Sequence, residues 1–452
     1  MSFVIHVALL SGRQTSLTAL TAETTVQELK QRAQQALHVT IASLSGTGGL
    51  LQPLLTLSEA GVCSGDTLHA ICCLATMASS RRSCAFALIR DGSVVTWGGS
   101  RDWCSSTLKE QLKEVVEVRA NMAAFAALRC DGSVVCWGSK ASGGDASAVQ
   151  HKLRNVRQIR ATAHAFAALL ADGSVVTWGD GGNGGDSRKV EDRLAGVRSI
   201  RGSSSAFAAL CADGQVVTWG NARQGGDSKK VQDELRDVVQ IRATFGAFAA
   251  LRGDGRVVAW GSHLHGGSVP LPSVSSSRLA LCDVRQLRGS DFAFAALRKD
   301  GRVVAWGSPS HGGETGRVQD QLMDVRQIRS SLGAFAALRA DGTVVSWGHA
   351  HYGGDSSAAQ GQLREVRLLR PSGFAFAALR ADGSVVTWGN RAHGGDSRAV
   401  QPQLTGVVEI RGSSSAFAAM CEDGRLVTWG NQATGGDSSA VQKELAERSA
   451  DT

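Results

Sequence analysis

Nine copies of one eight-residue segment constrain this chain more than any other feature. The segment DGSVVTWG occupies Asp172–Gly179, and close variants of it recur along the chain. Successive tryptophans of the segment lie 40 or 41 residues apart, except for one gap of 46. A fixed period of about 40 residues is typical of tandem repeats, in which each unit buries its faces against its neighbours. The sequence therefore predicts a mainly β array of about nine 41-residue repeats.

A single repeat, Val156–Leu194, shows what each unit contains. Val156–Arg160 has the composition of a short strand. Ala165–Leu170 is apolar on both faces, as expected of a strand covered on both sides. Asp172-Gly173 is a turn dipeptide, because glycine tolerates a positive φ, and Val175–Trp178 then returns as a third strand.

The second half of the repeat predicts a loop and a short helical turn. Gly184-Gly185-Asp186 breaks the strand, and the aspartate is placed to cap a helix. Val190 and Leu194 follow four residues apart, which is one helical turn with one apolar side. The phenylalanines and tryptophans of the repeats are predicted to fill the core between adjacent sheets rather than to form a ligand cage.

The repeats resemble those of the regulator of chromosome condensation family and of the related β-lactamase-inhibitor-type propellers. The shared features are the DGxVxxWG core, the glycine-rich loop after it and the V-x-x-I strand before the next copy. The resemblance covers about Ser80–Leu445 and implies a β-propeller-like fold. Ala165-Phe166 and its equivalents stand where the family usually has His-Ser. The family usually closes at seven blades, so nine cores leave open a larger closed form, end units outside a closed form, or an open spiral.

The first 74 residues differ from the repeats and predict a small α+β domain. Phe3–Leu10 and Thr15–Leu20 are typical of strands, Thr24 can cap a helix that follows it, and Thr67–Leu74 is a late strand. This order of elements resembles ubiquitin and its β-grasp relatives. The expected organisation is a ubiquitin-like domain at 1–74, a short linker at 75–79, a propeller-like repeat domain at 80–445 and a disordered tail at 446–452.

The ubiquitin resemblance implies a docking surface and also sets limits on it. The apolar patch of the family would map to Leu10, Ser45 and Ile71, with His69 nearby. The central position is serine rather than an aliphatic residue, and the segment continues through Cys72-Cys73 rather than ending in Gly-Gly. We therefore expect a built-in domain rather than a transferable tag. Two interpretations remain open: docking of ubiquitin-pathway proteins, or a β-grasp fold with no role in that pathway.

Eight arginines stand at one position of the repeat, six residues before the phenylalanine of AFA. Guanidinium groups pair well with carboxylates and phosphates, so this set is a candidate site for an anion or an acidic partner. The alternative is neutralisation within the fold, for example by the aspartate of the DG turn. The set comprises Arg119, Arg160, Arg201, Arg242, Arg288, Arg329, Arg370 and Arg411.

Charge and composition limit the classes of binding partner and the cellular compartments that we expect for this protein. The net charge is +8, and the first 74 residues contribute −1, so the basic balance lies in the repeats. That balance permits weak contact with nucleic acid without requiring it. The ten cysteines show no CxxC pair and are expected to be reduced thiols. Neither a secretory signal nor a long apolar run is visible, so we expect the protein in the cytoplasm or nucleus, away from membranes. We also expect it to be a monomer.

Catalytic and metal-binding motifs are not evident in the sequence. GxSxG, P-loop and HExxH patterns do not occur. Histidines gather in the glycine-rich loops, but no regular cysteine or carboxylate spacing accompanies them, so neither a metal nor a cofactor is expected. The irregular segment Ser268–Cys282 is either a recognition loop or tolerated drift.

Three functions follow from these patterns. The first is a non-enzymatic scaffold or adaptor that binds proteins through the repeat array. The second is a substrate-recruiting component of ubiquitination, for which the HECT domain of related ligases would be missing. The third is a guanine-nucleotide exchange or chromatin-binding role, which the family resemblance implies but which no residue of this chain could be matched to.

Overall fold

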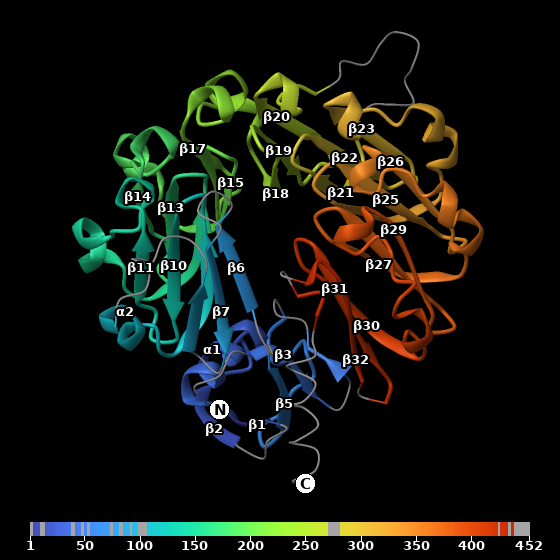
Figure 1. Ribbon diagram of the computed structural model, residues 1–452. Helices are drawn as coiled ribbons and strands as arrows, with labels where there is room; N and C mark the ends of the chain where they lie inside the picture. The colour runs from blue at the N-terminus through green and yellow to red at the C-terminus, as the bar shows by residue number, and fades with distance from the viewer. Residues whose placement is uncertain are drawn as a thin grey trace. The chain divides into compact units, whose positions relative to one another are not determined.

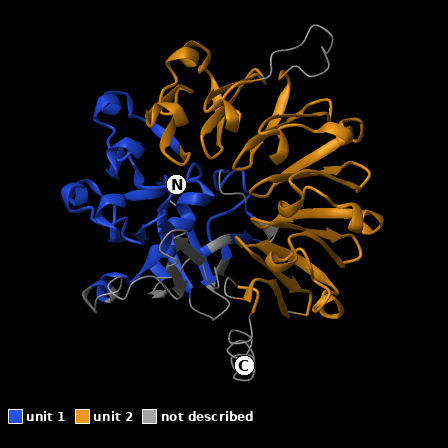
Figure 2. Ribbon diagram, turned by 45° about the horizontal axis from the view of Figure 1, so that its top comes forward, with its two compact units in different colours: residues 1–200 blue, residues 201–452 orange. Residues whose placement is uncertain are grey.

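The computed structural model describes residues 3–9, 14–37, 41–46, 49–51, 55–72, 76–80, 85–90, 93–97, 106–269, 281–423, 425–432 and 435–437. Within these residues the chain is mainly β, with one five-stranded sheet and nine three-stranded antiparallel sheets (Figure 1). The predicted fold class of about nine β repeats preceded by a small α+β domain is confirmed. Contacts divide the chain into two compact units, residues 1–200 and 201–452 (Figure 2).

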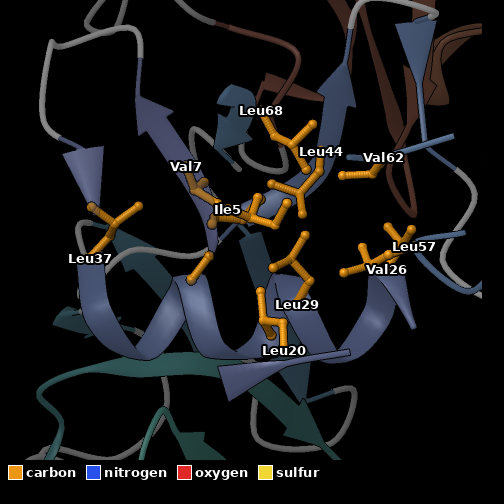
Figure 3. Close-up of a cluster of buried hydrophobic side chains, with 12 residues drawn as sticks. Ile5, Val7, Leu20, Val26, Leu29, Leu37, Leu44, Leu57, Val62 and Leu68 are labelled. Carbon is orange, nitrogen blue, oxygen red and sulfur yellow. The ribbon is translucent and has the colours of Figure 1, made fainter. Parts of the chain in front are cut away.

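The small α+β domain at the start of the first unit has a mixed sheet in the order β2-β1-β5-β3-β4. Strands β1 and β2 form an antiparallel hairpin, and β5 lies parallel to β1. Helix α1 packs its apolar side on this sheet, because Val26, Leu29, Ala33 and Leu37 recur at helical spacing and are buried (Figure 3). The bounds are β1 Phe3–Leu9, β2 Gln14–Leu20, α1 Val26–Leu37, β3 Ile41–Gly46, β4 Gly49–Leu50 and β5 Thr67–Cys72.

The residue that caps α1 is Thr25 rather than the predicted Thr24. The Thr25 hydroxyl accepts a hydrogen bond from the Glu28 amide at 3.2 Å, which satisfies one of the unpaired donors of the first turn. The Thr24 hydroxyl instead accepts from the Thr21 amide at 3.0 Å and stabilises the preceding turn. Both threonines fit the capping pattern in sequence, and only the backbone path distinguishes them.

The first unit continues with repeats, and its strand bounds correct one boundary. Strand β6 occupies Thr76–Ser80, most of the segment predicted as a linker, because it pairs with β7 as the first strand of a repeat. The bounds are β6 Thr76–Ser80, β7 Ala85–Arg90, β8 Ser93–Trp97, α2 Ser106–Gln111, β9 Val115–Ala120, β10 Ala124–Arg129, β11 Val134–Gly138, β12 Val156–Ala161, β13 Ala165–Leu170 and β14 Val175–Gly179. Strand β15, Val197–Gly202, spans the division between the units.

The second unit contains the most regular repeats. Each complete sheet is a first strand at one edge, an apolar middle strand and a third strand that carries the tryptophan. The bounds are β16 Ala206–Cys211, β17 Val216–Gly220, β18 Val238–Ala243, β19 Ala247–Arg252, β20 Val257–Gly261, β21 Val284–Gly289, β22 Ala293–Arg298, β23 Val303–Gly307, β24 Val325–Ser330, β25 Ala334–Arg339, β26 Val344–Gly348, β27 Val366–Pro371, β28 Ala375–Arg380, β29 Val385–Gly389, β30 Val407–Gly412, β31 Ala416–Cys421 and β32 Leu426–Gly430.

The middle strands explain why the AFAAL segment recurs. In β25 the residues Ala334–Leu338 are buried on both faces, because each sheet packs on the one before it and the one after it. Phe335 stacks on Trp347 of the same sheet, with 5.3 Å between ring centroids. The Trp347 indole N–H donates to the Gly312 carbonyl of the preceding repeat at 3.1 Å. The prediction that these aromatic residues are core is confirmed.

The turns and loops follow the predicted chemistry with one difference. The Asp341 carboxylate accepts from the Thr343 amide at 2.9 Å, and Gly342 has φ +79 as the DG turn requires. In the Gly-Gly loop, a Cβ on Gly354 would lie 2.3 Å from the Gly348 backbone, so only glycine fits. The predicted helical turn is a 3₁₀ helix, as in η5 at Arg188–Arg193. The predicted tail at 446–452 and most of the loop Ser268–Cys282 lie outside the described residues.

Candidate binding surface of the second unit

Six of the eight predicted site arginines lie in the second unit, on the first strands of successive repeats. In unit 2 these first strands contact one another in sequence order, β18 with β21, β21 with β24, β24 with β27, and β27 with β30. The arginine occupies the same register on each strand; Arg242, for example, pairs with Ala249 across the sheet. The strands therefore place one half-buried guanidinium per repeat on successive first strands. We use the name arginine row for Arg242, Arg288, Arg329 and Arg370.

Backbone carbonyls hold three members of the arginine row, and no described carboxylate pairs with any of the four. The Nε–H of Arg242 donates to the Leu287 carbonyl of the next first strand at 3.2 Å, and that of Arg370 donates to the Ile410 carbonyl at 3.1 Å. Arg288 makes the same contact, at 3.3 Å. The Nε of Arg329 is buried without a hydrogen-bond partner. Among the described residues, no carboxylate forms an ion pair with any of these four side chains, so their terminal nitrogens remain available to a ligand.

The electrostatics of the arginine row reflect this lack of counter-charge. Burial, with repulsion from Arg288 and Arg201, lowers the pKa of Arg242 to about 10. Burial also lowers the pKa of Arg329, and repulsion from Arg288 adds to it. The pKa of Arg370 is lowered by burial and by repulsion from Arg329 and Arg411, with partial relief from Glu409. All four side chains stay charged at neutral pH, and an anion would relieve their mutual repulsion.

The predicted neutralisation by the DG-turn aspartate does not occur in the arginine row. Those aspartates pair instead with the arginine that ends the middle strand, as Asp341 does with Arg339 at 3.1 Å and Asp382 with Arg380 at 2.9 Å. Arg119 and Arg411 are neutralised differently, by Glu117 and Glu409 two residues earlier on the same strand. The repeats of the arginine row have Gln240, Gln286, Gln327 and Leu368 at that earlier position.

A second set of arginines was missed in the sequence. Arg285, Arg326 and Arg367 lie three residues before the arginine row on the same strands and are exposed. Each donates through Nη2 to a carbonyl of the next first strand, at 3.0 Å for Arg285 and 2.9 Å for the other two. The repeated pattern V-R-x-[I/L]-R could have identified them. They raise the positive charge along the edge that the arginine row occupies.

The two remaining predicted arginines, Arg119 and Arg160, lie in the first unit. Arg160 donates to the Ile159 carbonyl at 3.2 Å, and Arg119 is paired with Glu117. In the second unit, burial lowers the pKa of Arg201. The structure thus divides the predicted eight arginines into two groups. The four of the arginine row have no described carboxylate partner, whereas Arg119 and Arg411 each pair with a glutamate.

The predicted ubiquitin-like docking residues are described only in part. Ser45 and His69 are cross-strand partners on β3 and β5, and the Ser45 hydroxyl donates to the His69 carbonyl at 3.4 Å. The His69 side chain is exposed. Ile71 lies on β5, opposite Ser43, while Leu10 lies outside the described residues.

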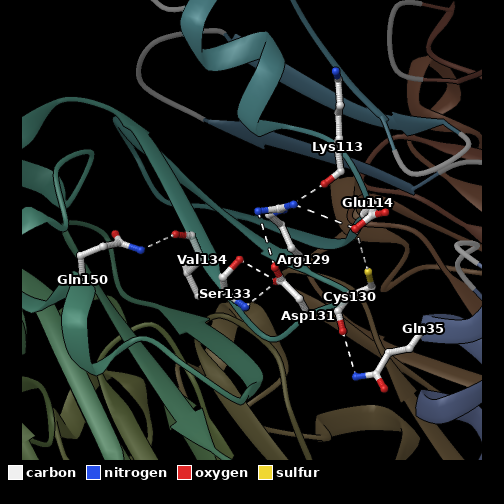
Figure 4. A network of polar contacts seen from close by, with 9 residues as sticks. All are labelled: Gln35, Lys113, Glu114, Arg129, Cys130, Asp131, Ser133, Val134 and Gln150. Atoms are coloured by element: carbon white, nitrogen blue, oxygen red, sulfur yellow. Dashed lines mark hydrogen bonds and ion pairs between the residues drawn. The ribbon is translucent and has the colours of Figure 1, made fainter.

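A polar network joins the small domain to the second repeat within the first unit (Figure 4). Gln35 of α1 donates to the Cys130 carbonyl at 3.0 Å, and the Cys130 thiol donates to Glu114 at 3.4 Å. Burial and the Glu114 carboxylate raise the pKa of the Cys130 thiol to about 11. Burial raises the pKa of Cys136 to about 12. Both thiols are therefore protonated at neutral pH and poorly suited to act as nucleophiles.

On the second unit the histidines of the glycine-rich loops contact phenylalanine and tyrosine side chains, a grouping that the sequence did not predict. They come from the turn after the first strand and from the 3₁₀ helices η8 (His263–His265), η10 (Pro309–His311), η12 (Ala350–Tyr352) and η14 (Arg391–His393). Ring centroids of neighbours lie 4.4 Å apart for Phe292–His311 and 4.5 Å for Phe374–His393. We call this set the aromatic strip: Phe245, His265, Phe292, His311, His349, His351, Tyr352, Phe374 and His393.

Because the pKa values of three histidines in the aromatic strip are lowered, we expect the protein to be less stable at acidic pH. Burial lowers the pKa of His265, while burial together with His349 lowers that of His311 and burial together with His351 lowers that of His393. As the pH falls, these histidines bind protons in the unfolded chain before they do so in the folded one. The stability that they contribute above about pH 6.5 is therefore lost as the pH falls below that value. We expect the thermal midpoint to drop between pH 7 and pH 5, and to drop less in a His265→Gln/His393→Gln variant. Equal slopes for both proteins would contradict this prediction.

Two absences hold for the described residues alone. No group of three or more histidine, cysteine, aspartate or glutamate side chains is arranged to hold a metal ion there. No helix of that part of the chain combines the length and apolar character of a membrane span.

Comparisons with known proteins give distant structural similarity and no family. No family model and no curated protein matches the chain. Among solved structures, Prp20p from Saccharomyces cerevisiae, studied for its binding to Gsp1p and histones, is 16% identical over 64% of this chain and 86% of its own, with a TM-score of 0.36. Human WBSCR16 is 17% identical over 76% of this chain and 86% of its own, with a TM-score of 0.35.

The ectodomain of the Arabidopsis thaliana receptor kinase ACR4 is also similar, at 14% identity over 61% of this chain and 97% of its own, with a TM-score of 0.34. At these identities and TM-scores the chain is not assigned to any of these families. Its own sheets and repeats define the class, a mainly β repeat protein with a small α+β domain.

Proposed function

We propose that this protein is a non-enzymatic scaffold that binds an acidic partner protein through the arginine row of its second unit. The observation that carries the proposal is a set of four successive arginines, three of them held by backbone carbonyls, with no described carboxylate to neutralise them. A buried or half-buried charge without a counter-ion is unfavourable. A carboxylate ligand would supply the missing charge through charge-assisted hydrogen bonds.

The repeat geometry supports an extended partner rather than a single small anion. One arginine of the row follows another on each first strand, and Arg285, Arg326 and Arg367 add charge on the same strands. A segment with several acidic side chains can engage successive guanidiniums at once. Such an edge lined with one sign of charge also attracts an oppositely charged partner before contact.

Calorimetric titration tests this function. The full chain should bind a peptide rich in aspartate and glutamate at low salt, and affinity should fall as salt rises because exposed charges are screened. A peptide of equal length in which lysine replaces the acidic residues is the control and should not bind. Absence of binding by the acidic peptide at low salt would overturn the proposal.

For the small domain we infer a ubiquitin-like fold and, as a second function, recruitment of ubiquitin-pathway proteins. Its sheet order β2-β1-β5-β3-β4 and the crossing helix α1 support this inference, as does the exposed His69 on β5. We expect capture of a ubiquitin receptor by the full chain to weaken at least tenfold in a His69→Glu variant, because a charge would be placed on the docking face. Capture that is absent, or unchanged in the variant, would leave this domain without the proposed role.

A further inference from the structure

We propose that the aromatic strip and the arginine row form one extended site, and that its ligand is an acidic peptide segment that also carries aromatic side chains. This inference rests on the proposed function of the arginine row and names the partner segment more closely. The two surfaces are continuous along the chain. Phe245 follows Arg242 by three residues, Phe292 follows Arg288 by four, and Phe374 follows Arg370 by four. The strip therefore begins where the strands of the arginine row end.

A line of backbone hydrogen bonds holds the base of the aromatic strip. The Phe245 amide donates to the Asp291 carbonyl at 2.7 Å, and the Asp291 amide donates to the Leu332 carbonyl at 2.8 Å. The line continues from Leu332 to Gly373 at 3.0 Å and from Gly373 to Ser414 at 2.8 Å. Each bond joins one repeat to the next, so the side chains beside the line sit on a rigid support. A preorganised surface loses little conformational entropy when a partner binds.

The repeats themselves show that the folding of a unit does not require these side chains. Where the strip has Phe292 and Phe374, other repeats have Ser205 and Ser415. Where it has Tyr352, another repeat has Gln224. Core positions behave differently, because the phenylalanine of the middle strand and the tryptophan of the third strand occur in every repeat. The aromatic side chains of the strip are therefore additions to a fold that is complete without them.

The exposure and orientation of the rings favour aromatic ligands. Phe245 is 37% exposed, His349 and His351 are exposed, and Phe292, Tyr352 and Phe374 are half-buried. At the centre of the strip the rings meet edge-on, with interplanar angles of 84° for His349–His351 and 87° for both His351–Tyr352 and His351–Phe374. Edge-to-face contact is a favoured geometry between aromatic side chains.

The same geometry favours a peptide over single-stranded nucleic acid. Base binding uses open aromatic faces that stack one base after another. In the strip, neighbouring rings cover one another, as Tyr352 and Phe374 do at 5.4 Å and 22°. Several imidazole nitrogens are also engaged within the protein, as His311 Nδ1 is with Ser310 and His351 Nε2 is with Asn390. The contacts that a ligand can add are therefore mainly edge-to-face ones, which suit phenyl, phenol and indole side chains.

Fluorescence anisotropy with two labelled peptides tests the inference on the full chain. Both peptides have the same length and the same number of acidic residues, and one has tryptophan and phenylalanine at the spacer positions where the other has serine. We expect the aromatic peptide to bind about tenfold more tightly. A Phe292→Ser/Tyr352→Gln/Phe374→Ser variant should lose this advantage while its affinity for the acidic-only peptide stays unchanged. A Met323→Thr variant, which alters an exposed apolar side chain outside the strip, is the control and should keep the advantage.

The outcomes separate this inference from the proposed function. If the acidic-only peptide fails to bind, the function of the arginine row is wrong. If it binds but the aromatic peptide gains nothing, or the gain persists in the triple variant, the strip is not part of the site. A tighter complex with an oligothymidylate than with either peptide would also overturn the inference. We expect the triple variant to keep its thermal midpoint, because serine or glutamine stands at each of these positions in another repeat. An unchanged midpoint shows that the variant has folded.

Discussion

Replacing Arg288 and Arg329 together by glutamine is expected to weaken binding of an acidic peptide by about a hundredfold and to stabilise the fold. A hydrogen bond to a charged group contributes about 1.5–3 kcal/mol, so two lost contacts give a loss of at least this size. At position 288 glutamine keeps a donor for the Ile328 carbonyl of the next strand, and at both positions it removes the charge. Because burial and repulsion from Arg288 lower the pKa of Arg329, losing both charges should raise the free energy of unfolding.

The matched control removes the same amount of charge elsewhere in the second unit, from the repeats of Arg242 and Arg288. Arg256 and Arg302 follow the DG turns, at the position where another repeat has Gln215, so glutamine is tolerated there. An Arg256→Gln/Arg302→Gln variant should bind the peptide within about threefold of the unchanged protein, because only long-range attraction is reduced. Equal losses in the two variants would mean that net charge, rather than the arginine row, binds the ligand. A fall in stability of the Arg288→Gln/Arg329→Gln variant would show that these side chains support the fold.

A Phe335→Ala substitution should produce the largest loss of stability among the changes considered. Phe335 is fully buried between two sheets and stacks on Trp347 at 5.3 Å. Removing a buried phenylalanine side chain leaves a cavity and decreases the free energy of unfolding by about 3–5 kcal/mol. Urea unfolding followed by tryptophan fluorescence measures this change.

Phe245→Ser is the control for that experiment. Phe245 belongs to the aromatic strip and is 37% exposed, and the preceding repeat has Ser204 at the same position. Its substitution should change the free energy of unfolding by less than about 1 kcal/mol. Comparable losses for the two phenylalanines would contradict the division between core rings and strip rings.

The repeat architecture could be predicted because its determinants are local. The DG turn, the apolar AFAAL strand and the tryptophan strand are each encoded within about eight residues. The predicted strands Ala165–Leu170 and Val175–Trp178 correspond to β13 and β14. The 3₁₀ geometry of η5 and the start of β6 at Thr76 were not predictable. Both depend on how one repeat packs on the next.

Of the binding surface, the arginines could be predicted from the sequence, but the aromatic strip could not, because it depends on how separate loops pack. The arginines stood out because they share one position of a regular period. Their pairing depends on whether a glutamate lies two residues earlier, as Glu409 does for Arg411, and a comparison among repeats could have shown this. The aromatic strip was hidden because Phe292 and His311 come from different loops, 19 residues apart, and meet only in the folded chain.

Photo-cross-linking with an acidic peptide that carries a diazirine side chain tests the arginine row most directly. We expect mass spectrometry of the cross-linked full chain to locate the adducts on the first strands β18, β21, β24 and β27 and on the turns that follow them. Adducts should disappear from β21 and β24 in the Arg288→Gln/Arg329→Gln variant. Cross-links confined to the small domain, or to the third strands that carry the tryptophans, would contradict the assignment of the acidic partner to this surface.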